Sequence, residues 1–281
     1  PWLATDVLLG IGSRLELQYL RWVKIPAGVK VIRIDIDPTE MFRLRPDVGI
    51  VTDAKLGARA LFEALSAALA KRPSRAEEFK ALKAQFRHDI QRVQPQMGYL
   101  DVIREVLPRD GFFVEEVSQV GFASRFGFPV YEPRTFVTGG YQDNVGFGFM
   151  TALGVKIANP DKPVVSVTGD GGFMFGVQEL ATAVKYGINL VTIVFNNASY
   201  GNVLRDQRNA YKGHEIGSSL TNPDFVKLAE SFGAAGYLAK TPAQLKSALE
   251  KALALSAPAL IEVPGEPGSE ASPWPFLHPN M

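Results

Sequence analysis

Three continuous apolar segments, VVSV, LVTIVF and ALIEV, constrain the fold of this chain most strongly. They lie within residues 164–168, 190–196 and 259–263. Uninterrupted apolar strands are typical of parallel sheets that helices cover on both faces, whereas alternating strands are half-buried. Helical periodicity marks residues 145–158, 177–186, 223–232 and 242–255, and shorter strands are expected at 112–117 and 135–138. This alternation predicts an α/β fold built on a doubly wound parallel sheet.

Two polar motifs each follow one of these strands. Asp170 lies in the sequence GDGG, and Asn197 lies in the pair NN, 27 positions further along. Because right-handed crossovers place the carboxyl ends of parallel strands at one edge, we expect both side chains to lie there together. Carboxylate and amide oxygens are ligands that Mg2+ accepts alongside phosphate oxygens. The backbone N–H groups of Gly171 and Gly172, at the start of a helix, suit a diphosphate.

Each motif has a simpler explanation when it is taken alone. Gly-Asp-Gly is a common turn, and Asn-Asn is common after a strand. The order strand, glycine-rich turn, helix, strand and Asn-Asn favours a binding site, because several independent structural requirements coincide. A P-loop phosphoryl-transfer enzyme is the weaker alternative, since the chain has no G-x-x-x-x-G-K-[S/T] motif.

Residues 169–203 resemble the diphosphate-binding motif of the thiamin diphosphate (ThDP) enzymes. Residues 139–154 resemble the segment that meets the pyrimidine ring in their acetolactate synthase, benzoylformate decarboxylase and pyruvate decarboxylase group. The resemblance implies that Asp170, the side chain of Asn197 and the backbone carbonyl of Ser199 bind Mg2+, and that Val145 supports the bent cofactor. The residues to which it assigns cofactor contacts are Gln119, Val145, Gly169, Gly171, Gly172, Ser199, Tyr200 and Gly201.

The assignment of Gln119 rests on a short alignment. The run EVSQV, residues 116–120, resembles the Asp-Val-Gly-Gln-His of acetolactate synthases, with Val120 in place of the histidine. The segment 204–220, rich in glycine, asparagine, serine and charged residues, resembles a flexible lid over the site.

Residues 1–72 resemble the second half of the central domain of acetolactate synthase-like enzymes, through the runs at 10–14, 34–38, 45–48 and 52–54. The resemblance implies FAD or nucleotide contacts for Arg14, Asp35 and Asp53. A simple strand-end turn is the alternative, because Leu15 occupies the position of the third glycine of a dinucleotide fingerprint. A strand at 7–9 stands at the start of the chain, and three strands are few for an open α/β domain, so we expect a chain cut inside a domain.

The predicted organisation therefore has four parts. Residues 1–72 form part of a central domain, 73–96 a charged helical linker, 97–268 the ThDP- and Mg2+-binding domain, and 269–281 a tail. A net charge of +1, with 30 basic and 29 acidic residues interspersed, argues against nucleic acid as a partner. The chain has no cysteine, which fits a reducing cytoplasm, and no apolar stretch approaches the ~20 residues needed to cross a membrane.

The resemblance implies a ThDP- and Mg2+-dependent, acetolactate synthase-like enzyme that forms or cleaves carbon–carbon bonds of small 2-oxo acids. A 2-oxo acid decarboxylase or lyase of the same group, or a noncatalytic ThDP-binding module, are the alternatives. In the family, the glutamate that activates ThDP lies on a separate pyrimidine-binding domain, which nothing in this sequence matches. We therefore assign no catalytic residue in this chain, and we expect a homodimer or homotetramer in which that domain completes the site.

Overall fold

A computed structural model describes residues 5–15, 26–69, 73–140 and 143–276. The chain forms two compact units, of which the larger comprises Lys83–Pro273 and the smaller comprises Pro1–Leu82 with Trp274–Met281. The division falls inside helix α3 (Ala76–Ile90), within the stretch predicted as a linker. Residues 1–4 and 70–72, at the two ends of the predicted central-domain part, and residues 277–281, at the end of the predicted tail, lie outside the described residues.

The larger unit is built on a six-stranded sheet in which every neighbouring pair is parallel. The strand order is β5-β4-β6-β7-β9-β8. The bounds are β4 Phe112–Glu115, β5 Phe136–Val137, β6 Val164–Gly169, β7 Val191–Asn196, β8 Ala235–Leu238 and β9 Ala259–Pro264. The chain runs outward from β4 to the edge strand β5 and returns to β6, so the winding direction reverses between β4 and β6. Ligands of open α/β sheets bind beyond the carboxyl ends of strands at such a switch point.

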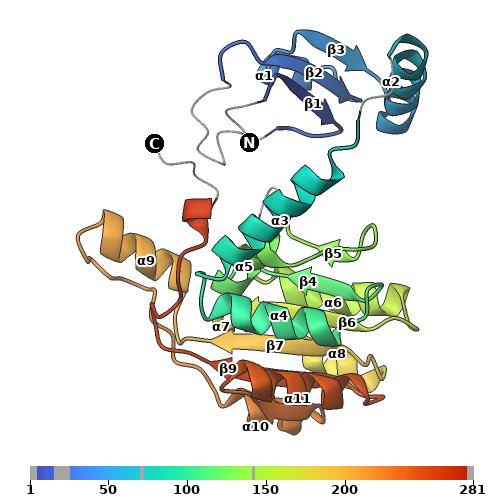
Figure 1. Cartoon of the computed structure of the whole chain (residues 1–281). Coiled ribbons are helices and arrows are strands. Elements are labelled where there is room, and N and C mark those ends of the chain that lie inside the picture. Colours follow the sequence, from blue (N-terminus) through green and yellow to red (C-terminus); the bar gives the residue numbers. More distant parts are fainter. Residues whose placement is uncertain (1–4, 16–25, 70–72, 141–142, 277–281) are drawn as a thin grey trace. The chain divides into compact units, whose positions relative to one another are not determined.

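Helices cover both faces of this sheet, which confirms the predicted doubly wound α/β class (Figure 1). Helices α4, α5 and α11 pack on one face, and α6, α8 and α10 pack on the other. A short helix, α7, begins directly at the end of β6, and α9 follows β7. The bounds are α4 Gln96–Val106, α5 Gln119–Gly127, α6 Phe147–Ala158, α7 Asp170–Phe173, α8 Glu179–Lys185, α9 Gly201–Ala210, α10 Phe225–Phe232 and α11 Pro242–Leu253.

Local sequence explains where several of these helices begin and end. Thr241 accepts a hydrogen bond from the backbone N–H of Gln244 (3.2 Å) at the start of α11, where the sequence Thr-Pro-Ala-Gln has the form of a capping box. Helix α10 begins at Phe225 rather than at the predicted Pro223, because the Asp224 side chain caps it by accepting from the N–H of Lys227 (3.0 Å).

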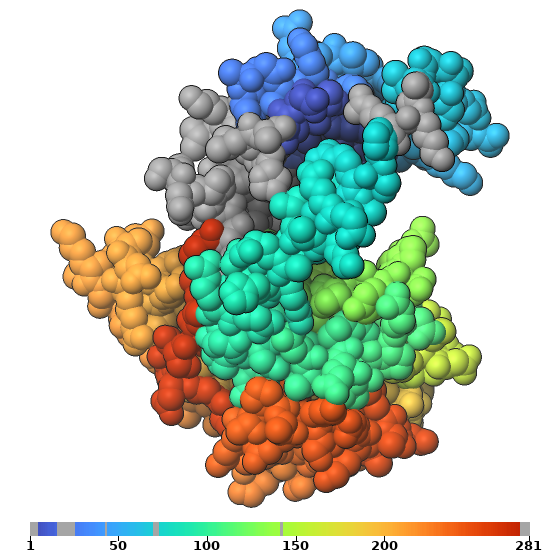
Figure 2. Space-filling model, viewed as in Figure 1, coloured from blue at the N-terminus to red at the C-terminus, as the bar shows by residue number. Residues whose placement is uncertain are grey.

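Two elements of the larger unit differ from the sequence prediction. Strand β8 is short, only partly buried and at the edge of the sheet, so its sequence AGYL carries no clear strand pattern. The segment predicted as a flexible lid begins as the regular helix α9, which stands out from the rest of the larger unit (Figure 1, Figure 2).

A buried aromatic cluster lies beneath the glycine-rich turn. The ring of Phe173, at the end of α7, is fully buried and meets Phe149 of α6 edge-on at a centroid distance of 5.1 Å. On its other side it meets Phe225 of α10 at 5.8 Å. These contacts belong to the core that joins α6, α7, α8 and α10 to the sheet, and they fix the turn that carries Asp170.

The described part of the smaller unit contains three strands, the number that the sequence predicted, and they are parallel in the order β1-β2-β3. They are β1 Val7–Ile11, β2 Lys30–Asp35 and β3 Val48–Val51, with helices α1 Glu40–Arg43 and α2 Ala54–Ala68. The guanidinium of Arg33 is buried within this unit, where it donates to the carbonyl of Ser13 (2.9 Å) and to Glu40 Oε2 (3.1 Å). Within the ranges that the structure describes, no helix combines the length and apolar character needed to span a membrane.

We expect Phe173→Ala to lower the free energy of unfolding by about 3–5 kcal/mol, because it opens a cavity among three buried rings. Denaturant titration followed by circular dichroism measures this loss. Phe175→Ala is the matched control, since that ring is 58% exposed. Equal effects of the two substitutions would show that the cluster does not fix the turn.

Candidate functional site

A cavity of about 150 Å³ opens at the carboxyl ends of β4, β6 and β7, beside the switch point of the sheet. Its lining includes every residue that the sequence assigned to Mg2+ or to cofactor contacts in the larger unit. They are Gln119, Val145, Gly169, Asp170, Gly171, Gly172, Asn197, Ser199, Tyr200 and Gly201. Residues from four separate stretches of the chain therefore face one hollow.

Asp170 supplies a buried carboxylate to this cavity. It is the first residue of α7, directly after β6, and only 2% of it is exposed. Burial raises the pKa of its carboxyl above the ordinary value, while hydrogen bonds from Asn222 and from backbone N–H groups act in the opposite direction. A carboxylate that burial destabilises gains most from a cation placed beside it.

Asn222 joins Asp170 to the Asn-Asn pair, although the sequence offered no functional role for it. Its side-chain Nδ2 donates to Asp170 Oδ2 (2.7 Å) and to Asn196 Oδ1 (2.8 Å). The side chain of Asn196 in turn donates to Glu262 Oε1 of β9 (2.7 Å). Asn196 therefore holds the turn, and the network connects β6, β7 and β9.

Asn197 presents its amide in one defined orientation. Its Oδ1 accepts from the backbone N–H (3.1 Å) and the hydroxyl (2.9 Å) of Ser199, and its Nδ2 donates to Glu270 Oε1 (2.8 Å). Glu270 lies in the segment after β9 and also lines the cavity. No local motif marks it in the sequence, because it approaches Asn197 from 73 positions further along the chain.

The turn after β7 is pinned by a second segment of backbone. Ser199 and Ser219 form an antiparallel bridge, the N–H of Tyr200 donates to the carbonyl of Ser218 (2.8 Å), and the N–H of Leu220 donates to the carbonyl of Ala198 (2.8 Å). Ala198 has a positive φ of 52°, a conformation that side-chain-bearing residues adopt rarely. The end of the predicted lid is thus paired with the Asn-Asn turn.

The glycines of the GDGG turn have a steric reason beyond leaving their N–H groups uncovered. A Cβ atom on Gly171 would lie 2.4 Å from the ring of Tyr200, and one on Gly172 would lie 2.2 Å from Glu116 Oε1. The turn is therefore packed against Tyr200 on one side and against Glu116 on the other. A side chain at either glycine would displace the turn from its position between Tyr200 and Glu116.

The three residues suggested for FAD or a nucleotide lie together in the smaller unit. Arg14, Asp35 and Asp53 line a cavity of about 360 Å³ there, with Gly12, Asp37 and Glu40. Asp53 also caps α2 by accepting from the N–H groups of Lys55 (2.9 Å) and Leu56 (3.2 Å), and Asp35 accepts from the N–H of Asp37 (3.0 Å). This arrangement fits both alternatives for the three residues, which are contacts to a bound nucleotide and hydrogen bonds within a local turn.

The family model of the C-terminal TPP binding domain of thiamine pyrophosphate enzymes matches residues 116–263. This range covers more than half of the chain and contains β6, β7 and the residues assigned to Mg2+. The chain belongs to the thiamine pyrophosphate enzyme family. Thiamine pyrophosphate and thiamin diphosphate are two names for the same cofactor.

Two sequence relatives illustrate the range of this family. A probable acetolactate synthase large subunit of Methanococcus aeolicus is 31% identical over 293 residues, covering 96% of this chain and 49% of that protein. A 2-hydroxyacyl-CoA lyase of Arabidopsis thaliana is 31% identical over 296 residues, covering 98% of this chain and 52% of that protein. The chain thus spans about half the length of the curated relatives that it matches.

A solved structure shows the same fold. The ThDP-dependent 4-hydroxybenzoylformate decarboxylase of Rhodococcus jostii RHA1 superposes with a TM-score of 0.72 at 22% identity, over 93% of this chain and 49% of that one. Together the family model and these relatives place the chain among the thiamine pyrophosphate enzymes, with sequence similarity to an acetolactate synthase subunit and to a 2-hydroxyacyl-CoA lyase.

We expect Asp170→Asn to raise the melting temperature of the metal-free chain near neutral pH by a few degrees. This rise corresponds to a gain of roughly 1 kcal/mol in the free energy of unfolding. The raised folded-state pKa means that the stability contributed by Asp170 is complete below the unfolded pKa near 3.8 and is lost as the pH rises through the folded pKa. The difference between variant and wild type should therefore widen from about pH 4 to about pH 7.

Thermal unfolding in a chelator at several pH values measures this difference. Asp206→Asn, at an exposed position of α9, controls for the general effect of removing one negative charge. If the difference in melting temperature between Asp170→Asn and wild type stays constant with pH, Asp170 is not a carboxylate that burial destabilises.

Proposed function

We propose that this chain binds the Mg2+ complex of ThDP in the cavity at the carboxyl ends of β4, β6 and β7, as the diphosphate-binding half of an enzyme. The observation that carries the proposal is that Asp170, Asn197 and Ser199 all line this one cavity, beside the GDGG turn. A carboxylate, an amide oxygen and a backbone carbonyl are a suitable protein share of an octahedral Mg2+ site, and phosphate oxygens and water complete it.

The residues around the cavity divide the work of holding the ligand. Asp170, Asn197 and Ser199 would hold the metal, and Gly171 and Gly172 would bring backbone N–H groups to the diphosphate. Val117, Val120, Val145 and Val203 give the rest of the lining an apolar character that suits the organic part of the ligand and excludes water from it. When bound, ThDP supplies a nucleophilic carbon and an electron sink for bond formation or cleavage beside a carbonyl.

The reaction that we propose is acetolactate synthase-like, namely carbon–carbon bond formation or cleavage with small 2-oxo acids. The acetolactate synthase relatives support this reading. The alternative, a ThDP-dependent decarboxylase or lyase, is supported by the 2-hydroxyacyl-CoA lyase relative, which is equally identical over its aligned length. A noncatalytic ThDP-binding module would use the same metal-binding residues.

Other features stay proposals that rest on the sequence. The activating glutamate is expected from a separate pyrimidine-binding domain, in an assembly of two or four copies. FAD or another nucleotide is a second proposed ligand, for the cavity that holds Arg14, Asp35 and Asp53. A cytoplasmic location is expected from the absence of cysteine.

We expect calorimetry to show that ThDP binds the chain in the presence of Mg2+ and that a chelator abolishes the binding. Asp170→Ala and Asn197→Ala should each weaken it by about 100-fold or more, because each removes one of three protein ligands of the metal. Asn159→Ala is a matched control, because this asparagine does not line the cavity. Its side chain donates a hydrogen bond to the carbonyl of Val155 at the end of α6. Unchanged affinity in both site variants would overturn the proposal.

The noncatalytic alternative can be separated by adding the missing half. The chain is mixed with the pyrimidine-binding half of an acetolactate synthase relative, and pyruvate consumption, CO2 release and acetolactate are measured. An enzyme half should restore turnover that depends on Asp170. Binding of ThDP without any turnover, although the two halves associate, would favour the noncatalytic module.

A further inference from the structure

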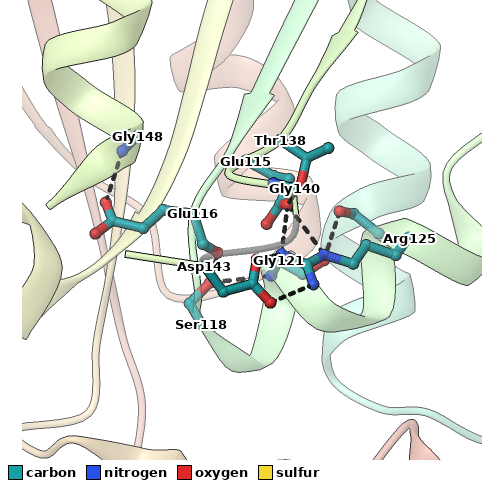
Figure 3. Close-up of polar contacts among 10 residues, drawn as sticks. Glu115, Glu116, Ser118, Gly121, Arg125, Thr138, Gly140, Asp143 and Gly148 are labelled. Atoms are coloured by element: carbon teal, nitrogen blue, oxygen red, sulfur yellow. Dashed lines mark hydrogen bonds and ion pairs between the residues drawn. The ribbon is translucent and has the colours of Figure 1, made fainter. Parts of the chain in front are cut away.

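Two adjacent glutamates at the end of β4 are buried, and neither is among the residues that we propose to hold Mg2+ and the diphosphate. Glu115 is 0% exposed and Glu116 is 1% exposed. Successive side chains of a strand point to opposite faces, and here the two carboxylates point apart (Figure 3). Burying a carboxylate costs free energy unless hydrogen bonds or charges compensate it. The partners of each glutamate therefore indicate what it does.

The partners of Glu116 belong to the start of α6 and to the end of β6. Its Oε1 accepts from the N–H of Gly146, and its Oε2 accepts from the N–H of Gly148 (3.3 Å) and from the hydroxyl of Thr168 (2.5 Å). A Cβ on Gly148 would lie 2.7 Å from the Glu116 Cβ, and Oε1 also packs against Gly172. Glu116 is thus packed between the start of α6 and the GDGG turn.

The partners of Glu115 are Thr138, directly after β5, and Arg125 of α5. Its Oε1 accepts from the hydroxyl of Thr138 and from Arg125, at 3.0 Å from Nε and 2.8 Å from Nη2. Arg125 also forms a bidentate pair with Asp143, at 2.8 Å from Nη1 and 2.5 Å from Nη2 (Figure 3). The side-chain oxygen Oε2 of Glu115 has no hydrogen-bond partner among the described residues.

Contacts of both glutamates reach residues 138–148, which run from the end of β5 into the first turn of α6 and are named the 138–148 loop below. Thr138 and Asp143 are tied to Glu115, directly or through Arg125, and Gly146 and Gly148 are tied to Glu116. Residues 141 and 142 of this loop, part of the pyrimidine-facing segment predicted at 139–154, lie outside the described residues.

The 138–148 loop contributes Val145 to the lining of the cavity, next to Gly146. Asp170 and the GDGG turn take the diphosphate end of the ligand in the proposed function, so Val145 meets its organic part. The position of Val145 relative to the turn then sets how well one ligand reaches both. A site must hold such groups within about 0.5 Å of the productive geometry, which requires supporting hydrogen bonds.

We propose that Glu115 and Glu116 act together as a clamp that holds the two ends of the 138–148 loop and keeps Val145 in register with the GDGG turn. They are positioning residues, because they act on the ligand through the loop. The inference rests on the proposed function for the nature of the ligand, whereas the clamp itself rests on contacts within this chain.

Two probes separate the clamp from the metal grip. ThDP and inorganic pyrophosphate, each with Mg2+, are titrated into the full chain by calorimetry, since pyrophosphate carries no organic part. Asp143→Asn weakens the ion pair to Arg125 without altering the sheet, and Glu116→Gln replaces one acceptor of the clamp by a donor. We expect each variant to weaken ThDP binding by about tenfold or more and pyrophosphate binding by less than about twofold.

Matched controls remove the same kind of group at exposed ion pairs. Asp110→Asn breaks the pair with Lys162, and Glu105→Gln breaks the pair with Lys246; both should leave both affinities unchanged. Equal weakening of ThDP and pyrophosphate by Asp143→Asn, or no weakening of either, would overturn the clamp. Should Glu116→Gln fail to fold, Asp143→Asn alone decides.

Amide hydrogen exchange gives a readout that does not depend on the ligand. Exchange at Gly146 and Gly148 should speed up by about tenfold in Glu116→Gln while core strands such as β7 keep their protection. If the wild-type chain binds neither probe, the proposed function fails, and the exchange result still tests the clamp. Uniformly faster exchange throughout the larger unit would show that Glu116 has only a general structural role.

Discussion

The burial of the Asp170 carboxylate is the constraint on which the rest of the site depends. An acid at the end of a central parallel strand is costly in the absence of a cation, and among the described residues it is held by hydrogen bonds rather than by a base. Asn222 connects it to Asn196 of β7, and Asn196 is anchored on Glu262 of the adjacent strand β9. The oxygen atoms that we propose as metal ligands are therefore held in place without a metal, an arrangement that would lower the cost of binding one.

The sequence predicted the parallel, doubly wound sheet and placed the proposed metal-binding residues together at its carboxyl edge, because both inferences follow local rules. Continuous apolar runs identify strands buried on both faces, and the residue directly after such a strand must lie at the carboxyl edge. Asp170 and Asn197 follow from this reasoning, and the family resemblance supplied Val145, Gln119 and Ser199. The structure brings all of them to one cavity.

What the sequence did not reveal depends on contacts between distant segments. Asn222 reaches Asp170 across 52 positions, and Glu270 reaches Asn197 across 73. Glu116 was read only as part of an alignment around Gln119, since a glutamate at a strand end is usually solvated. The polar composition of residues 204–220 resembles a flexible lid, whereas part of this segment belongs to helix α9, which projects from the unit and needs few apolar residues.

The close packing of Glu116 against glycine has a consequence for how this sequence can diverge. Its side chain occupies the space in which a Cβ at Gly148 or Gly172 would lie, and its carbonyl occupies that of Gly121. Substitution of Gly121, Gly148 or Gly172 by a residue with a side chain is thus sterically disfavoured while Glu116 is present. A homologue with a smaller residue at this place could accept alanine at positions 148 and 172, whereas position 121 would stay restricted by backbone. Substitutions at 116, 148 and 172 should therefore appear together in descendants of this chain.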